Sequence, residues 1–528
     1  MNGLEHANQN KSNFLAVNIP ADGLFLAILR KAKGDLSESN CTRIIKEYIS
    51  RYLEAKPDTI LLNVCYRRCL TPSEVFDSYL YDVQTDENGF ALKNEDGTSV
   101  KTLSPTSQNV SKYFASFFTC ARVLLQNGID IYKTAVTQIR AAGCKVLLSV
   151  RMNDWHYIDD PAVNSAFTFK NDGMYTIHQD CGYLDFSQLP VQNHIYEYVQ
   201  ELLETYRVDG IELDWLRHPT ALPQDKCKDY SILNGYMRRI RTLLDRYDPS
   251  LCLAVRVLAN EQDNLDNGMD ASQWIADGSA DMITVENFYI PTNYEIPVSQ
   301  WRDSIAKRNA AGRVYRLLCG SDWAVSCMIR YQIAMSPALV RGFTEQSLRA
   351  GADGVYLFNF FEENDTSSFE FATDSTGAGY LKNCFLERMQ AAKEPDKLPK
   401  RYVHIGSSNE RYPIAVAAAG SYTWYSKVPN ATGKLKITVG LDVDVPCRVW
   451  INGNFQMLSR EPVCAGFEYI PEEEIGNHEF IYAVSQTAPY VKSCWLPKVS
   501  LSQEEIAVTI QNDAQQAAHI VWLEISCE

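Results

Sequence analysis

Two carboxylates spaced two residues apart stand out as groups that could do chemistry. Glu212 and Asp214 alternate with Ile211 and Leu213, so both acids leave the same face of a short apolar strand. A carboxylate on a buried strand is costly unless it is paired or used. Tryptophan, arginine and histidine follow at once, as Trp215, Arg217 and His218. We therefore interpret this stretch as part of a site rather than of a core.

Other expected strands also run into polar side chains. These residues are Arg151, Asn153, Asp154 and His156; Glu286 and Asn287; Asp322; and Asn359. Three tryptophans each directly follow an aspartate: Trp155, Trp215 and Trp323. A flat aromatic face beside carboxylates suits a sugar ring, whose C–H face stacks while its hydroxyls form hydrogen bonds. We expect these residues, with Glu212, Arg217 and His218, to bind a carbohydrate in one cleft.

Eight short apolar segments alternate with helical patterns across residues 13–390. The segments cover 13–19, 59–65, 145–150, 210–214, 251–257, 280–286, 313–319 and 353–359. Apolar residues recur at helical spacing over 37–55, 113–126, 131–142, 190–205, 230–246 and 337–350. Such alternation demands parallel crossovers, and eight units predict an α/β fold of the (β/α)8 TIM-barrel type. Active sites of these barrels lie at the C-terminal ends of the strands, where the polar residues fall.

The pattern changes after a charged, proline-bearing stretch near residue 393. We expect three parts: a barrel catalytic domain over 1–392, a linker over 393–402 and a second domain over 403–528. Short alternating segments and a hairpin signal at Asn452-Gly453 predict an all-β sandwich for the second domain. Carbohydrate binding there through Trp424, Trp450 or Trp495 is one interpretation. A packing module with tryptophans in its core is the favoured one.

The composition is that of an ordinary globular protein with an acidic balance. Of the 528 residues, 46% are hydrophobic and 22% are charged, and the formal net charge is -15. Nucleic acids and anionic membranes attract basic surfaces, so neither is an expected partner, whereas a neutral carbohydrate is. No apolar run of about 18 residues occurs, so no membrane span is expected.

The cysteines and the first residues bear on the compartment. Fifteen cysteines are scattered along the chain without a C-x-x-C motif, which indicates buried thiols in a reducing environment. The polar start lacks the apolar core of a signal peptide. We therefore expect a cytoplasmic protein without disulfides, metal or cofactor, unless a signal peptide has been removed. No oligomeric state is predicted.

Asp214 and Glu286 form the candidate catalytic pair. Glycosidic cleavage needs one protonated and one ionised carboxyl group on opposite sides of the bond. The two acids end strands four and six, and the ~4.8 Å strand spacing puts their backbones roughly 9–10 Å apart. This separation allows either retaining or inverting geometry. We expect Arg151 or Arg256 to neutralise Glu212 and to help keep Asp214 ionised.

The segment VDGIELDW at 208–215 carries a resemblance to known enzymes. It resembles the strand-four motif D-G-[IF]-x-[LF]-D-[WF] of family 18 chitinases and, more closely, of the predicted glycosyl-hydrolase-like family 10 group. RMND at 151–154 and RHP at 217–219 look like strand-end motifs of that wider group. The resemblance covers roughly residues 13–390 and implies a TIM-barrel glycoside hydrolase. Family 18 enzymes carry their catalytic Glu where this chain has Leu216, so their acetamido-assisted chemistry is not expected.

Three functions are open on this evidence. A glycoside hydrolase leads, because a carboxylate pair and aromatic residues meet at the expected active face. A barrel that binds carbohydrate without cleaving it is the alternative, supported by Leu216. A metal-dependent hydrolase would use Asp154, His156, Asp214 and His218, but the eight histidines form no H-x-H or H-x-x-x-H pair at a strand end. Asp154 and His156 are also a second candidate acid–base pair, in which Asp154 would replace Glu286.

Overall fold

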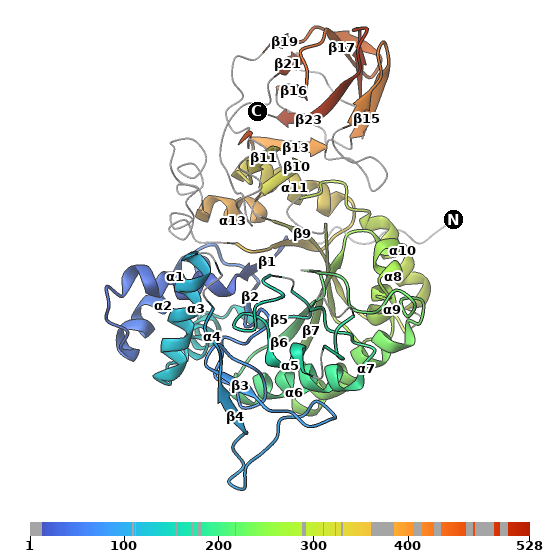
Figure 1. Ribbon diagram of the computed structural model, residues 1–528. Coiled ribbons are helices and arrows are strands. Elements are labelled where there is room, and N and C mark those ends of the chain that lie inside the picture. The colour runs from blue at the N-terminus through green and yellow to red at the C-terminus, as the bar shows by residue number, and fades with distance from the viewer. Residues whose placement is uncertain are drawn as a thin grey trace.

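The computed structural model describes most of the chain as two domains (Figure 1). The described residues are 13–107, 110, 112–154, 156–170, 173–177, 182–216, 218–287, 292–309, 311–322, 324–328, 331–360, 385–404, 414–426, 434–460, 468–469, 490–496 and 505–527. A parallel barrel occupies the lower part of Figure 1, and an antiparallel domain lies above it.

Eight parallel strands close the barrel. They are Phe14–Ile19 (β1), Thr59–Asn63 (β2), Lys145–Arg151 (β5), Gly210–Asp214 (β6), Cys252–Leu258 (β7), Met282–Glu286 (β8), Arg316–Ser321 (β9) and Gly354–Leu357 (β12). Their order around the barrel is β1-β12-β9-β8-β7-β6-β5-β2. The predicted TIM-barrel fold is therefore confirmed.

Helices surround the barrel in the intervals between strands. They are Ala21–Lys31 (α1), Glu38–Leu53 (α2), Lys112–Gln126 (α3), Ile131–Ala141 (α4), Ala166–Phe169 (α5), Leu189–Thr205 (α6), Ser231–Tyr247 (α7), Glu261–Asp266 (α8), Ala271–Ala276 (α9), Val298–Arg308 (α10), Pro337–Arg349 (α11) and Phe385–Lys393 (α13). The expected helices are confirmed, and α2 begins after Ser37, whose hydroxyl accepts the backbone N–H of Asn40. Helix α1 was missed because most of its residues are buried, which removes the polar face that marks an amphipathic helix.

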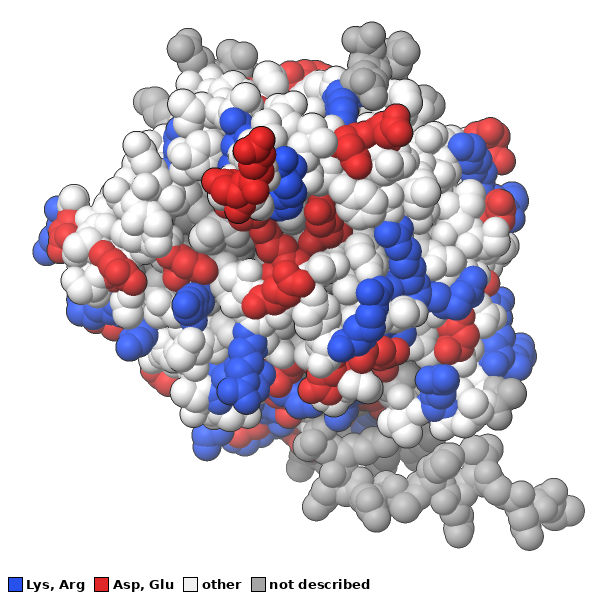
Figure 2. Space-filling model, turned by 90° about the horizontal axis from the view of Figure 1, so that it is seen from below, with Lys and Arg blue, Asp and Glu red and all other residues white. Residues whose placement is uncertain are grey.

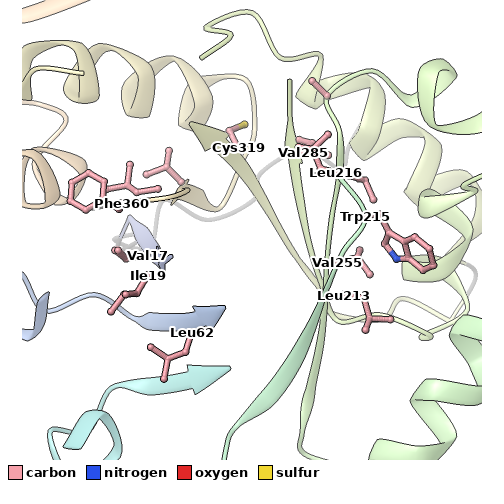
Figure 3. Packing of buried hydrophobic residues seen from close by; sticks show 14 of the residues in the cluster. Val17, Ile19, Leu62, Leu213, Trp215, Leu216, Val255, Val285, Cys319 and Phe360 are labelled. Carbon is pink, nitrogen blue, oxygen red and sulfur yellow. The ribbon is translucent and has the colours of Figure 1, made fainter. Parts of the chain in front are cut away.

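Alternation along the strands separates the barrel interior from the layer under the helices. The interior contains a small cluster made of Ala16, Leu61, Leu147, Ala254, Met282, Leu318, Tyr356 and Phe358. Residues of opposite parity, such as Val17, Leu62, Leu213 and Val255, belong to the large core outside the strands (Figure 3). Asn63, Arg151, Glu212, Asp214, Arg256 and Glu286 share the parity of the interior cluster, as the alternation predicts.

Every second strand is preceded by an aspartate at the N-terminal end of the barrel: Asp58, Asp209, Asp281 and Asp353. Each carboxylate accepts the backbone N–H of the strand before it, from Leu15, Val146, Leu253 and Leu317, at 2.8–3.0 Å. Each also pairs with a helix cation: Lys393, Arg140, Arg241 and Arg302. Glycine follows two of these acids because a Cβ at Gly210 or Gly354 would lie 2.1 or 1.9 Å from a neighbouring backbone oxygen.

The first and last strands meet at a seam. Beyond the pairing of β1 with β12, the backbone N–H of Asn359 donates to Asn18 Oδ1 at 3.3 Å. Asn13 Nδ2 donates to the carbonyl of Lys393 at 3.3 Å, and Lys393 Nζ donates to the carbonyl of Asn13 at 3.1 Å. The two ends of the barrel domain therefore touch.

Two antiparallel sheets form the second domain, as predicted. The larger holds Lys400–His404 (β13), Ile414–Val416 (β14), Leu435–Leu441 (β16), Ser459–Arg460 (β19), Tyr490–Leu496 (β21) and Ala518–Cys527 (β23); the smaller holds Ser421–Ser426 (β15), Cys447–Ile451 (β17), Asn454–Gln456 (β18) and Ile506–Asn512 (β22). The expected hairpin joins β17 to β18. Strand β13 pairs with β23 from Lys400 onward, so the sandwich begins inside the stretch expected to be a linker.

Short hairpins lie in the long barrel loops. Tyr81–Val83 (β3) pairs with Lys101–Leu103 (β4) inside the loop that follows β2. Ala324–Met328 (β10) pairs with Tyr331–Ala334 (β11) after β9, and Glu468–Tyr469 (β20) from the second domain adds to β11. The loop after β9 therefore shares a small separate sheet with one segment of the second domain.

Surface charge, helix hydrophobicity and the state of the cysteines do not distinguish between the candidate functions. Seen from below, Lys and Arg are interspersed with Asp and Glu, and acidic side chains gather near the centre of the face (Figure 2). None of the helices in the described ranges is both long and apolar enough to cross a membrane. Cysteines in these ranges carry free thiols, and burial raises the pKa of Cys65 and of Cys319 to about 12.

Candidate active site

Charges of alternating sign stand on four consecutive strands at the barrel mouth. Arg151 ends β5, Asp214 ends β6, Arg256 lies near the end of β7, and Glu286 ends β8. The strand register places Arg151 beside Asp214, and Asp214 beside Arg256. None of the four is more than 4% exposed. Buried charges persist only when they are paired, and the alternation supplies each with a neighbour of opposite sign.

Arg256 joins the two acids of the predicted catalytic pair. Its Nη1 donates to Asp214 Oδ1 at 2.9 Å and Oδ2 at 3.2 Å, and its Nε donates to Glu286 Oε2 at 2.8 Å. Because nitrogens of one guanidinium are roughly 2.3 Å apart, Asp214 Oδ1 and Glu286 Oε2 lie at most about 8 Å from each other. The Phe358 ring covers the guanidinium, with 3.4 Å from Cζ to the ring centre. This separation is compatible with a carboxylate pair that cleaves a glycosidic bond.

The carboxyl group of Glu286 is a weaker acid than an exposed glutamate. Burial raises the pKa of Glu286 to about 7; Arg256 opposes this rise, and the charges of Asp322 and Asp214 add to it. Gly320 on β9 provides the space for the carboxyl group, because a Cβ there would lie 2.1 Å from Glu286 Oε2. A carboxyl group with a pKa near 7 is partly protonated at neutral pH, which suits proton donation.

Glu212 lies deeper in the barrel and has neutral partners. Its Oε2 accepts the hydroxyls of Ser149 at 2.6 Å and Tyr356 at 3.0 Å. Burial, together with the charge of Asp214, raises the pKa of Glu212 to about 8. Glu212 is therefore mostly protonated at pH 7, beneath the pair that Arg256 joins.

Arg151 pairs with Asp154 instead of Glu212. Its Nη1 donates to Asp154 Oδ2 at 2.8 Å. Asp154 Oδ1 binds the Nδ1 and, at 3.0 Å, the backbone N–H of His156, and it lies 4.0 Å from His218 Nδ1. Burial disfavours the charged form, yet His156, Arg151 and His218 hold the pKa of Asp154 well below its usual range. The expectation that an arginine neutralises Glu212 was therefore wrong: within the described residues both candidates bond other acids.

Three other predicted residues lie at the same mouth. Asn359 Oδ1 accepts Arg151 Nη2 at 3.5 Å, and its backbone φ of 45° is a left-handed conformation that asparagine tolerates. Asp322 follows β9 and acts on the charge state of Glu286. Asn287 directly follows Glu286 and is partly exposed. Left-handed residues of this kind cluster at functional sites, which agrees with the placement of Asn359.

Trp215 does not face the mouth. It is 1% exposed and packs in the layer under the helices, against Phe186, Tyr236 and Trp274 (Figure 3). The alternation that points Asp214 inward points the next residue outward, so a sugar ring cannot stack on this indole. The expectation of a stacking surface at Trp215 was therefore wrong. Leu216 is also buried in this outer core, and its backbone N–H donates to Asp214 Oδ1 at 3.2 Å.

The side chain of Asn153 bonds three other loop segments of the barrel, at Arg67, Leu184 and Thr220. Its Oδ1 accepts Arg67 Nη1 at 2.7 Å and the N–H of Leu184 at 3.0 Å. Its Nδ2 donates to the carbonyls of Leu184 at 3.2 Å and Thr220 at 2.7 Å. These bonds occupy both polar atoms of the side chain, so we leave Asn153 out of the proposed substrate contacts. Trp155, Arg217 and Trp323 lie outside the described residues, and their binding roles stay predictions.

Sequence reasoning missed three residues that the structure brings to the site. Ser149 and Tyr356 bond Glu212, and Phe358 covers Arg256. Their strand parity marks them as interior residues, but the candidates were polar residues at strand ends and the tryptophans beside them, which do not include these three. Within the described residues, no group of three or more His, Cys, Asp or Glu side chains is arranged to hold a metal ion.

Comparisons with known proteins return distant structural matches, with TM-scores of 0.41 and below among those described next. No protein-family model and no curated protein matches the chain. An endo-1,4-beta-mannanase from Rhizomucor miehei aligns with 74% of this chain and 97% of its own, at 11% identity and TM-score 0.41. An alpha-L-fucosidase from Paenibacillus thiaminolyticus aligns at 12% identity and TM-score 0.38; 72% of this chain spans only 49% of that enzyme.

The matches are not restricted to glycosidases. Tryptophan synthase from M. tuberculosis aligns with 73% of this chain and 94% of its own, at 11% identity and TM-score 0.33. The structural neighbours thus include glycoside hydrolases, but at these scores none of them carries an argument about function.

Proposed function

We propose that this protein is a glycoside hydrolase in which Glu286 is the general acid and Asp214 the nucleophile or base. The observation that supports it best is the pair itself: two buried carboxyl groups at the C-terminal face, bridged by Arg256 and at most about 8 Å apart. No other acid needs to be recruited for the reaction.

The two acids are in different environments, as their roles require. Within the described part of the chain, the donors to Asp214 are N–H groups, from Arg256 and from the backbone of Leu216, and such donors suit an ionised carboxylate. Glu286 keeps a pKa of about 7 because burial opposes its ionisation. One group therefore attacks or activates water while the other protonates the leaving oxygen. Asp154 is held ionised by Arg151 and two histidines, so we assign it to substrate positioning.

Arg256 also favours a second candidate function. It engages both acids at once, and both are almost completely buried. A barrel in which this ion-pair network is purely structural would bind carbohydrate at its mouth without cleaving it. Turnover separates the two candidates.

The test uses the full chain on a panel of aryl glycosides, with sugar binding followed by calorimetry. Asp214→Asn should lower kcat/KM by about 10²–10⁴-fold, the range for a lost acid–base group. Asp209→Asn, the same change at the other end of β6, should leave turnover intact. Glu286→Gln should lose less activity on dinitrophenyl glycosides than on glycosides with poor leaving groups, because a dinitrophenolate leaves without being protonated.

Two outcomes would overturn the glycosidase. Sugar binding without turnover on any substrate would favour the non-catalytic barrel. Turnover that chelators abolish, and that Asp214→Asn leaves unchanged, would favour a metal-dependent hydrolase instead.

A further inference from the structure

Glu295 ties the loop after β8 to the second domain. This loop begins at the candidate acid, Glu286, and reaches Glu295 before α10 starts. Two side chains of the sandwich converge on that carboxylate: His404 Nδ1 lies 3.0 Å from both oxygens, and Trp424 Nε1 donates to Oε1 at 2.7 Å. Trp424 stacks on His404 with ring centres 5.1 Å apart. The carboxylate is thus held by two aromatic rings that are themselves fixed.

The same loop reaches back to the candidate site. Thr292 Oγ1 donates to the carbonyl of Asp322 at 3.4 Å. Asp322 lies two residues beyond Gly320, where a Cβ would lie 2.1 Å from Glu286 Oε2. Between these contacts, Tyr294 is buried against α11, where its hydroxyl donates to the carbonyl of Leu339 at 2.8 Å. A continuous run of contacts therefore leads from the sandwich through residues 292–295 to the surroundings of the acid.

A second connection holds the loop that follows Asp322. Strands β10 and β11 form its hairpin, and β20, a short segment of the second domain that belongs to neither sandwich sheet, pairs with β11 at Tyr331–Tyr469 and Gln332–Glu468. Backbone pairing of this kind fixes position along the strand. Both loops that flank Glu286 on this side of the mouth are therefore attached to the second domain.

We propose that the sandwich is part of the active face, and that Glu295 is a positioning residue through which His404 and Trp424 set the place of Asp322 beside Glu286. The proposal rests on the proposed function for its catalytic consequence. It gives the second domain a task other than carbohydrate binding: holding two barrel loops in register.

Glu345 on α11 provides a matched comparison within the same interface. It accepts Lys400 Nζ at 2.6 Å and the hydroxyl of Tyr402, both from the sandwich. It therefore bonds two sandwich side chains, as Glu295 does, but it stands on an outer helix rather than on a loop of the mouth. Loss of either carboxylate weakens the interface, while only Glu295 lies on the path to the acid.

The experiment compares two substitutions that each delete one hydrogen bond across the interface. Trp424→Phe removes the bond to Glu295, and Tyr402→Phe removes the bond to Glu345. Hydrogen exchange of backbone amides in 282–287 and 316–322 should accelerate several-fold in Trp424→Phe and stay unchanged in Tyr402→Phe. Glu295→Gln and Glu345→Gln repeat the comparison if a ring change disturbs packing.

The pH profile supplies the catalytic readout. Arg256, Asp322 and Asp214 are the charged groups that act on Glu286, and displacement of Asp322 removes a cause that raises its pKa. Since Glu286 must be protonated to act, the alkaline limb of kcat should move to lower pH in Trp424→Phe only. Glu295→Asp keeps a carboxylate that can bond His404 or Trp424, so its alkaline limb should lie closer to that of wild type than the limb of Glu295→Gln does.

The outcomes separate this proposal from the function on which it rests. Equal hydrogen exchange in Trp424→Phe and Tyr402→Phe would overturn the positioning role whether or not the protein cleaves glycosides. Accelerated exchange confined to Trp424→Phe, in a protein that turns over no glycoside, would support the coupling of sandwich to mouth and defeat only the glycosidase. If Trp424→Phe and Tyr402→Phe differ in hydrogen exchange but have the same pH profile of kcat, the proposed role of Asp322 in linking Glu295 to Glu286 would be overturned.

Discussion

Strands β6 and β8 each carry one acid at the N-terminal end and another at the C-terminal end. Asp209 and Asp281 have side chains 27% and 46% exposed; Asp209 pairs with Arg140, and Asp281 pairs with Arg241, which also pairs with Asp245. Asp214 and Glu286 are 0% and 3% exposed, and they share Arg256. The acids at the two ends of these strands thus differ in access to water, and only the two at the C-terminal end share one arginine with each other.

On the proposed function, the difference separates acids that hold neighbouring strands together from acids that take part in the reaction. At the N-terminal end each acid also accepts a backbone N–H, so it replaces a hydrogen bond that the strand edge would otherwise lack. At the C-terminal end, among the residues that the structure describes, the two acids accept one backbone N–H, from Leu216 to Asp214. Buried ion pairs are weak evidence for stability, because desolvation offsets their attraction. A chemical role explains the C-terminal group better.

Removal of the shared arginine should have the largest effect on stability. Arg256→Met leaves two buried acids without their common partner, and we expect the free energy of unfolding to fall by about 3–5 kcal/mol in urea titrations. Arg140→Met removes the partner of the half-exposed Asp209 and should cost about 1 kcal/mol or less. Similar losses in the two variants would contradict the contrast between the two ends of the barrel.

The pH dependence of stability should carry the signature of the buried acids. Glu286 and Glu212 have pKa values raised to about 7 and about 8, above the ordinary value of 4.5. Between pH 4.5 and 8 the folded protein therefore holds protons that the unfolded chain has released, so a rise in pH favours unfolding. The stabilisation is complete below pH 4.5 and is lost as pH passes each folded-state pKa.

The measurement is a difference between wild type and Glu212→Gln/Glu286→Gln at pH 5, 6, 7 and 8. Wild type should lose on the order of 6 kcal/mol relative to the double variant across this range, because Glu286 contributes over about two pH units and Glu212 over about three. Buried His194, with a pKa lowered to about 3, contributes the opposite slope up to about pH 6.5, but it is common to both proteins. A constant difference at all four pH values would show that the two acids do not hold these protons.

Two glycines give the smallest and most local comparison. A Cβ at Gly210 meets the backbone oxygen of Cys252, whereas a Cβ at Gly320 meets the side chain of Glu286. Both alanine variants should lose about 1–3 kcal/mol of stability through overpacking, Gly210→Ala more because a backbone cannot move aside. Only Gly320→Ala should displace the acid, so only it should change the pH profile of kcat/KM. A changed pH profile of kcat/KM in Gly210→Ala would show that the effect does not depend on contact with Glu286.

The strands and their faces could be predicted because both follow from local patterns. Period-two alternation is enough to place Arg151, Asp214 and Glu286 inside the barrel, and closure of the barrel brings them to one mouth. The partner of each charge could not be predicted in this way. Arg256 reaches both acids because its long side chain spans three strands, and its choice of Asp214 and Glu286 over Glu212 depends on depth within the barrel.

The misreading of Trp215 has a related cause. Proximity to Asp214 along the chain suggested a shared task, but adjacent residues on a strand point to opposite faces. Glu295 gave no signal at all in the sequence, because its partners, His404 and Trp424, lie more than a hundred residues later. Contacts between distant segments are set by how the domains meet, which no local pattern encodes.

The seam between β1 and β12 constrains how the chain can be made. Asn18 and Asn359 bond across 341 residues, and Asn13 meets Lys393 across 380. At about 5–20 residues per second, β1 leaves the ribosome at least about 17 seconds before its last neighbour. During that interval the half-built barrel has two open strand edges, which recruit other chains readily. Newly synthesised protein is therefore most prone to aggregate before β12 emerges, and the sandwich, which begins only at Lys400, is made too late to shield it.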